Sequence, residues 1–174
     1  MLTPLPDHQL VLDFVNTRTR DEDLLSTRAL TADWVAARTG AEAPPEFSGR
    51  DVAKLKELRA LLGELFDFLT PTTVRRVDAL LADLRLVPRL GDHATVALML
   101  DVTDRSPVAA VSQLVVASLL SLAQGPGLAT VRSCAAPDCL IRFSSTNPRR
   151  QWCNSGGCGN RERVRRHYRR RHAS

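Results

Sequence analysis

All four cysteines of the 174-residue chain lie in two pairs of identical spacing, Cys134-Ala-Ala-Pro-Asp-Cys139 and Cys153-Asn-Ser-Gly-Gly-Cys158. The second pair is followed at once by Gly159-Asn160-Arg161 and an arginine-dense tail. Tetrahedral zinc takes four thiolate or imidazole ligands, usually delivered as two close pairs. The proline of the first loop and the two glycines of the second let the sulfurs of each pair turn toward one point. The spacing therefore predicts one structural zinc ion, with the ligands Cys134, Cys139, Cys153 and Cys158.

Other uses of these cysteines stay open. Two disulfides are typical of secreted, oxidised chains, and residues 1–7 lack the basic start and apolar core of a signal peptide. Free thiols are a further alternative. His167 and His172 could replace two sulfurs, but only eight residues separate Cys158 from His167, whereas a finger with two cysteines and two histidines uses about a dozen. We expect both histidines to lie on the helix of the tail.

The composition is that of an ordinary soluble globular protein, with 44% hydrophobic and 25% charged residues. The length suggests one domain, or one domain with a small appendage. No run approaches the roughly 20 apolar residues that span a bilayer. We therefore expect a cytoplasmic protein with no membrane partner.

The charge is unevenly distributed along the chain. Residues 132–174 hold eleven arginines and no lysine against only Asp138 and Glu162, a net charge of +9, whereas residues 1–131 carry −4. One zinc ion with four thiolates contributes −2, so the metal-loaded tail keeps about +7. A concentrated basic segment of this kind is the electrostatic footprint of a polyanion binder.

Residues 1–131 predict four helices. Ser26 can cap a helix that runs to Arg38, and Ser48 with Asp51 forms a capping box that opens a helix reaching residue 69. Thr70-Pro71 and Ser106-Pro107 each place a cap and a first-turn proline, which open helices through residues 84 and 123. The last of these is apolar on both faces, so we expect it to be the central, most buried helix.

Several short segments predict strands. Residues 10–17, Leu-Val-Leu-Asp-Phe-Val-Asn-Thr, form a nearly continuous apolar run, which we interpret as a short buried strand or strand-to-turn segment. Residues 95–100 are expected to pair with 86–90 in a hairpin around Gly91-Asp92. A short strand at 128–132 leads to the first cysteine, and a second is expected at 141–143.

Asp13 and Asn16 interrupt the apolar run at 10–17. They could line a small-ligand pocket, or their side chains could bond the local backbone at the end of a strand. The chain has no glycine-rich phosphate loop, no nucleophile elbow and no paired carboxylates at useful spacing. We therefore expect no enzymatic activity, and catalysis through Asp13 and Asn16 is only a remote alternative.

The tail predicts a helix that begins at the fourth cysteine. Trp152, beside Cys153, is expected to cover the metal site and exclude water. Val164 and Tyr168 fall on one face and are expected to anchor the helix to the zinc core. The arginines form outward stripes on the other faces, and guanidinium groups can hold phosphate bidentately or reach guanine in the major groove. Most of their contacts should be to phosphates.

The predicted nucleic-acid contacts include Asn160 and Arg161, which lie near the helix start and are candidates for contact with base edges. Buried hydrogen bonding around the zinc loops is an equal alternative for Asn160. The full set is Arg149, Arg150, Asn160, Arg161, Arg163, Arg165, Arg166, Arg169 and Arg170.

The cysteine pairs, Trp152, Cys158-Gly159-Asn160-Arg161 and the later Arg-His-Tyr resemble the CGNR zinc finger of bacterial proteins. In those proteins the finger follows an ABATE domain, to whose opening segment Leu-Asp-Phe-Val-Asn-Thr at 12–17 is similar. The resemblance spans nearly the whole chain and is most specific at residues 134–168. It implies a stress-induced or otherwise regulated transcription regulator that binds DNA through the finger.

We therefore expect an α+β fold: a mainly helical ABATE-like domain with a few short strands at 1–131, then a small treble-clef-like four-cysteine zinc module with a basic C-terminal helix at 132–174. The expected function is zinc-dependent DNA binding in transcription regulation, with duplex DNA as the partner. The N-terminal domain would sense a small-molecule effector or form a homodimer. RNA binding, a protein-interaction module and a thiol redox sensor are the alternatives.

Overall fold

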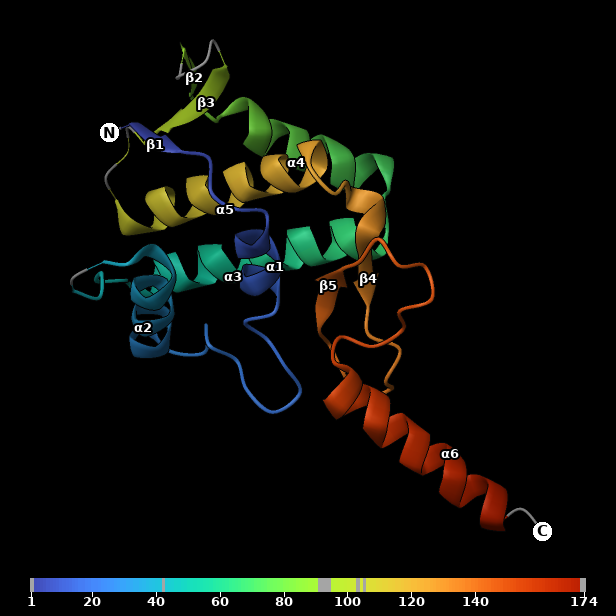
Figure 1. Ribbon diagram of the computed structural model, residues 1–174. Coiled ribbons are helices and arrows are strands. Elements are labelled where there is room, and N and C mark those ends of the chain that lie inside the picture. Colours follow the sequence, from blue (N-terminus) through green and yellow to red (C-terminus); the bar gives the residue numbers. More distant parts are fainter. Residues whose placement is uncertain (1, 42, 91–94, 103, 105, 173–174) are drawn as a thin grey trace.

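The computed structural model describes the chain except residues 1, 42, 91–94, 103, 105 and 173–174. It is a mixed helix and strand fold, as predicted. Helices α3 and α5 run side by side with α1 against them, and α2 lies toward one end of α3 (Figure 1). The helices of this part are α1 (Gln9–Val15), α2 (Arg28–Thr39), α3 (Gly49–Asp67), α4 (Pro71–Ala82) and α5 (Pro107–Gln124).

The strand predicted at residues 10–17 is wrong, because this segment forms helix α1. Its four apolar residues from Val11 to Val15 are all buried, while Gln9 and Asp13, four residues apart, lie on the other face, where Gln9 Nε2 donates to Asp13 at 3.0 Å. This single polar pair in a seven-residue helix is too short a signal to separate it from a buried strand. The Val11 amide donates to the Ser118 hydroxyl of α5 at 2.9 Å, and that hydroxyl donates to the Asp7 carbonyl at 2.6 Å. A serine inside the core thus fixes the start of α1.

The helix boundaries follow the predicted capping residues with one correction. Ser48 and Asp51 form the reciprocal capping box of α3, and Thr70 caps α4. Helix α2 is capped by Thr27 instead of Ser26, because the Thr27 side chain accepts the hydrogen bond from the Leu30 amide. Ser106 precedes α5 as predicted, although its side chain makes no capping hydrogen bond.

A three-stranded antiparallel sheet covers one end of the helices. Its order is β1 (Leu2–Pro4), β3 (Val96–Asp101), β2 (Leu86–Leu90). The predicted hairpin of β2 and β3 is confirmed, and Leu90 pairs with Val96 at its tip. The turn predicted at Gly91-Asp92 lies outside the described residues. Strand β1 was not predicted, since a three-residue strand carries no periodic signal.

Helix α5 is the centre of the larger hydrophobic core, as predicted. Its buried side chains, which include Val115 and Leu119, pack with those of α1, α3 and α4. By length and composition alone α5 could cross a membrane, and it is the one described helix for which this holds. The core helix of a soluble protein passes the same test, so this is weak evidence for a membrane span.

A second, smaller unit follows α5. The strand predicted at 128–132 is a 3-10 turn, η2 (Leu128–Thr130), and then strand β4 (Val131–Ser133), which pairs with β5 (Arg142–Ser144). A wide turn, η3 (Ser155–Gly159), leads into helix α6 (Asn160–His172). Helix α6 projects away from the rest of the molecule (Figure 1).

Polar contacts join the two units at β5. The Asn16 side chain donates to the Arg142 carbonyl at 2.7 Å and accepts from the Arg142 amide at 2.8 Å. The Arg142 guanidinium pairs with Asp67 at the end of α3, through Nε at 3.1 Å and through a second, shorter contact. Ser133 also donates to Asp67, at 3.1 Å. These bonds hold the β4–β5 hairpin against α1 and α3.

Candidate metal centre and basic helix

The four cysteines converge on one point although they come from two distant loops. Their sulfur atoms all lie within 4.8 Å of one another, and all four are free. The Cys139 and Cys153 sulfurs are 3.8 Å apart, and those of Cys153 and Cys158 are 3.7 Å apart. Zinc–sulfur bonds of about 2.3 Å in a tetrahedron place the sulfurs about 3.8 Å apart. The four cysteines are positioned to hold one metal ion, consistent with structural zinc.

Backbone hydrogen bonds of the hairpin bring the first pair to this point. The Cys134 amide donates to the Ile141 carbonyl at 3.0 Å, and the Cys139 amide donates to the Ala136 carbonyl at 3.0 Å. The Ala135 amide donates to the Gln151 carbonyl at 2.8 Å, which ties the first loop to the segment before the second pair. These bonds close the turn between Cys134 and Cys139 and place it beside the second pair of cysteines.

A small apolar cluster surrounds the sulfurs. Cys134, Cys158, Ala136 and Phe143 are buried, and Trp152 packs against them as predicted. A Cβ at Gly159 would lie in ordinary contact with the Trp152 ring at 3.4 Å and with the Asn154 carbonyl at 3.5 Å, so the indole packs against the start of α6. The cluster limits access of water, as expected of a closed structural site.

The thiols influence one another's ionisation. Burial raises the pKa of the Cys153 thiol, and hydrogen bonds from the neighbouring thiols raise it further. Burial also acts on Cys134, but hydrogen bonds from the amides of Cys153 and Ala136 outweigh it and lower the pKa of that thiol. Four thiolates at this spacing repel each other, so the cluster needs a cation to become fully ionised.

Asn154 organises the turn between the last two cysteines. Its side-chain oxygen accepts from the amides of Gly156 at 2.8 Å and Gly157 at 3.2 Å, and its carbonyl accepts from the Gly159 amide at 2.9 Å. This capped turn satisfies amides at the start of the helical segment. Helix α6 therefore leaves the metal centre in a defined direction.

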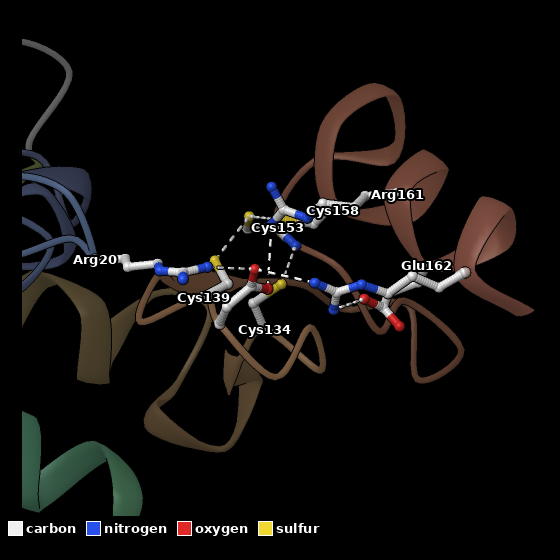
Figure 2. A network of polar contacts seen from close by, with 9 residues as sticks. Arg20, Cys134, Cys139, Cys153, Cys158, Arg161 and Glu162 are labelled. Atoms are coloured by element: carbon white, nitrogen blue, oxygen red, sulfur yellow. Dashed lines mark hydrogen bonds and ion pairs between the residues drawn. The ribbon is translucent and has the colours of Figure 1, made fainter.

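Asp138 links the first cysteine loop to α6 and to the N-terminal part, and sequence reasoning missed it. Its carboxylate pairs with Arg161 at 3.5 Å, Arg165 at 3.3 Å and Arg20 at 2.8 Å. Figure 2 shows Arg20 and Arg161 reaching this region from opposite sides. Partial desolvation raises the pKa of Asp138, but its own backbone amide and the three arginines outweigh it and hold that pKa below the usual range.

The predicted apolar anchor of α6 is wrong. Val164 is 45% exposed and Tyr168 is 59% exposed, and no described residue of α6 is buried. The helix touches the metal centre only through its first turns, so later residues extend past the apolar cluster. Ionic contacts of Arg161 and Arg165 hold it instead of apolar packing.

The predicted nucleic-acid contacts divide into two groups. The Arg150 guanidinium donates to the carbonyls of Trp152 at 3.1 Å and Cys153 at 2.6 Å and stacks on the Phe143 ring at 4.5 Å. Arg163 donates to the Ser155 carbonyl at 3.2 Å. Within the described chain no partner is found for the guanidinium groups of Arg149, Arg166, Arg169, Arg170 and Arg171; the last was missing from the prediction.

Arg161 and Asn160 differ in their surroundings. The Arg161 guanidinium lies 3.4 Å from the Cys158 sulfur and 3.5 Å from Asp138, where a cation would offset the negative charge of a metal–thiolate cluster. These contacts favour a positioning role. Asn160 is exposed, and the described residues offer its side chain no hydrogen bond. Its contact with a base edge stays a prediction.

The remaining candidates lie apart from the metal centre. His167 and His172 are on α6 as expected, with His172 stacked on Tyr168. Asp13 pairs with Arg38 at 2.8 Å, and Asn16 binds the Arg142 backbone. The hydrogen bonds of Asn16 to the Arg142 backbone favour a structural role for this side chain over a role in a ligand pocket.

Two family models match the chain. Residues 130–171 match the family described as "CGNR zinc finger". Residues 8–137 match the ABATE family, described as "Putative stress-induced transcription regulator". No curated protein and no solved structure matches the chain.

Proposed function

Because the chain belongs to the ABATE family, described as "Putative stress-induced transcription regulator", and residues 130–171 match the CGNR zinc finger, we propose that it is a zinc-dependent regulator that binds duplex DNA. Residues 132–174 form the DNA-binding module, and residues 1–131 sense a ligand or form a dimer. Both matched families are of the regulator or zinc-finger type, which supports a non-enzymatic role in the cytoplasm.

The observation that carries this proposal is the set of unpaired arginines on a projecting helix. Arg166, Arg169 and Arg170 have no partner within the described chain, and α6 extends from the metal centre into solvent. Guanidinium groups that are not neutralised internally are available to phosphates. The metal holds the root of this helix, so DNA affinity should depend on zinc.

Fluorescence anisotropy with zinc-loaded protein and random-sequence duplex DNA tests the proposal. We expect a log–log salt slope of roughly −4 to −6, for about five or six phosphate contacts. Removal of zinc should abolish the affinity. Replacing Arg166, Arg169 and Arg170 by glutamine should reduce the magnitude of the slope by about three.

The matched control is a triple glutamine variant of Arg28, Arg50 and Arg75, which are exposed and lie on α2, α3 and α4. It removes the same charge and should keep most of the affinity. Salt-insensitive binding, or no binding at low salt, would contradict the proposal. Because one module offers little contact area, sequence selection from a random pool should work best if the protein dimerises.

Single-stranded RNA is a second candidate, favoured by one observation. Tyr168 is exposed among the arginines of α6, where its ring could stack on an unpaired base. In this case single-stranded RNA should compete successfully with duplex DNA, and Tyr168→Ala should weaken RNA binding while duplex binding is kept. If Tyr168→Ala weakened the binding of RNA and of duplex DNA equally, the tyrosine would act by positioning α6 and not by stacking on a base.

A further inference from the structure

A cleft of about 780 Å³ lies where the N-terminal helices meet the zinc module. We call it the junction cleft. Residues of α3 such as Lys56 and Arg59 form one wall, Arg18 and Asp23 of the loop after α1 form another, and Arg142 of β5 contributes from the zinc module. The volume falls in the range of small-molecule sites.

Three carboxylates line the junction cleft: Glu64 pairs with Arg76 outside the cleft at 3.7 Å, and Asp23 and Asp67 are each bound by an arginine of the cleft itself. The Arg59 guanidinium binds both oxygens of Asp23, at 2.6 and 2.9 Å, and Arg142 binds Asp67. Arg59 is 8% exposed, so this ion pair is largely removed from water. An incoming anion would therefore meet little uncompensated negative charge from Asp23 or Asp67.

Two cations of the junction cleft remain unpaired. Within the described part of the chain, no carboxylate lies within 4.0 Å of Arg18 or Lys56, and no hydrogen bond of their side chains is found. Lys56 is half-buried, which strengthens its interaction with an anion relative to a fully exposed lysine. The neighbouring hollow formed by residues 18–23, Pro137 and Asp138 is richer in carboxylates and suits an anion less well.

The walls between these charges are apolar. Val15 is buried, and Ala60 and Leu140 complete the surface. The Arg142 guanidinium lies beside Gly63, at 3.6 Å from the position of a methyl group there, which is an ordinary van der Waals distance. A ligand that fills the cleft should therefore carry an apolar body as well as a negative group.

We infer that the junction cleft binds a small organic anion, with a carboxylate or phosphate group held by Arg18 and Lys56 and an apolar body against Val15, Ala60 and Leu140. This inference rests on the proposed function only in assigning the anion the role of effector. The binding itself does not depend on DNA.

The contacts of the cleft connect it to the basic helix. The short loop that supplies Arg18 and Asp23 also carries Arg20, which pairs with Asp138, and Asp138 pairs with Arg161 and Arg165 of α6. Arg142 belongs both to the cleft and to the hairpin of the metal centre. A ligand that shifts this loop or Arg142 would change the placement of α6. By linkage, ligand and DNA then change each other's affinity by the same factor.

Titration of the zinc-loaded full chain, followed by amide chemical shifts, tests the inference. The probes are benzoate, phenyl phosphate, inorganic phosphate and the neutral analogue benzamide, at low ionic strength. We expect saturable shifts at Ala60, Gly63 and Leu140 with benzoate or phenyl phosphate, with a Kd on the order of 1 mM for such small probes. The relative affinity of these two probes distinguishes a carboxylate from a phosphate ligand.

The double variant Arg18→Gln, Lys56→Gln should weaken binding at least tenfold, whereas the control Arg28→Gln, Lys54→Gln removes the same charge at exposed sites and should not. No saturable shift with either organic anion, equal binding of benzamide, or unchanged affinity in the double variant would overturn the inference. If inorganic phosphate bound as tightly as phenyl phosphate, the cleft would not recognise an apolar body, and that part of the inference would be overturned.

The effector role is tested separately, by DNA anisotropy with and without the better probe. A change in DNA affinity that the double variant loses and the control keeps supports it, and no change overturns it. Failure of the protein to bind DNA at all would overturn the proposed function, while the chemical-shift titration would still report on the cleft.

Discussion

Asp23 and Arg59 show how a single carboxylate holds a guanidinium inside the fold. Arg59 also donates to the buried Thr17 hydroxyl at 3.0 Å, and that hydroxyl donates to the Phe14 carbonyl at 2.7 Å. The side-chain hydrogen bond from Arg59 lowers the pKa of Asp23, although burial opposes it. The pair thus ties the loop after α1 to α3.

We predict that Asp23→Asn destabilises the fold by about 2–4 kcal/mol at neutral pH, because it leaves a nearly buried arginine without its counter-charge. A carboxylate whose folded pKa is lowered stabilises the protein above its unfolded pKa of about 3.9. This contribution is lost as the pH falls through the lowered folded value. Urea unfolding should therefore show that the difference in stability between wild type and variant shrinks as the pH falls below about 5.

The control for this prediction is Asp21→Asn, on the same loop. Asp21 is exposed, and no partner of its side chain is found within the described residues. Its stability and pH dependence should match those of the wild type. A destabilisation equal to that of Asp23→Asn would show that loop charge in general, and not the Arg59 pair, is responsible.

Asp138→Asn is expected to act locally. The substitution removes the counter-charge of Arg161 and Arg165, so the first turns of α6 should exchange their amide protons faster. Global stability should change little, because surface ion pairs contribute little. Hydrogen exchange measured by NMR checks this, with Asp33→Asn, exposed on α2, as the control. Unchanged protection of α6 would contradict the positioning role of Asp138.

Single residues with a local role could be predicted from the sequence. The capping box of Ser48 and Asp51 and the cap at Thr70 depend only on neighbours within three residues, and both are confirmed. The sequence does not decide between Ser26 and Thr27 as the cap of α2, because both residue types cap helices and they are neighbours in the chain. Asp138 could not be found in this way, since its partners are separated from it by 23 residues or more.

At the scale of elements, α1 and α6 show why two predictions failed. Helix α1 has only seven residues, and Gln9 and Asp13 are its one polar pair at helical spacing, which is too short a pattern to separate a helix from a buried strand. In α6, two apolar residues at helical spacing suggested a packed face, but spacing does not say whether a partner surface exists. The cysteine spacing was more informative, because four thiolates that bind one metal ion must lie close together in any fold.

Removal of zinc should unfold the smaller unit and leave the larger one folded. The apolar cluster at the sulfurs is separate from the main core, so α1, α3 and α5 keep their packing. Helix α6, with seven arginines and no buried residue, should lose its structure without the metal anchor.

A chelator series followed by far-UV circular dichroism and amide exchange checks the prediction on zinc, and Cys158→Ser should reproduce the effect. The amides of α3 and α5 serve as the internal control. Retained protection of α6 in metal-free protein would show that ionic contacts alone hold the helix.

At the scale of the whole molecule, Asn16 is the residue that joins the two units most directly. Its side chain makes both a donor and an acceptor bond to the Arg142 backbone. We predict that Asn16→Ala costs about 1–3 kcal/mol, because it leaves partly buried backbone groups without partners. Thermal or urea unfolding measures this cost, and amide exchange should show the β4–β5 hairpin opening more easily.

Asn160→Ala is the control, since Asn160 is exposed and free of hydrogen bonds within the described chain. If Asn160→Ala lowered the stability as much as Asn16→Ala, the hydrogen bonds between Asn16 and Arg142 would not be what joins the two units. No sequence pattern indicates this contact, because 126 residues separate its partners. The two units could be predicted separately, but their mutual placement could not.

The absence of buried side chains along α6 has a consequence for the history of such proteins. Substitutions beyond the first turns of this helix meet no packing constraint, so a descendant can exchange its cationic residues for others without losing the rest of the architecture. If the proposed function holds, target preference and stability can change independently, and a gene duplicate could recognise new DNA sites while residues 1–131 stay unchanged.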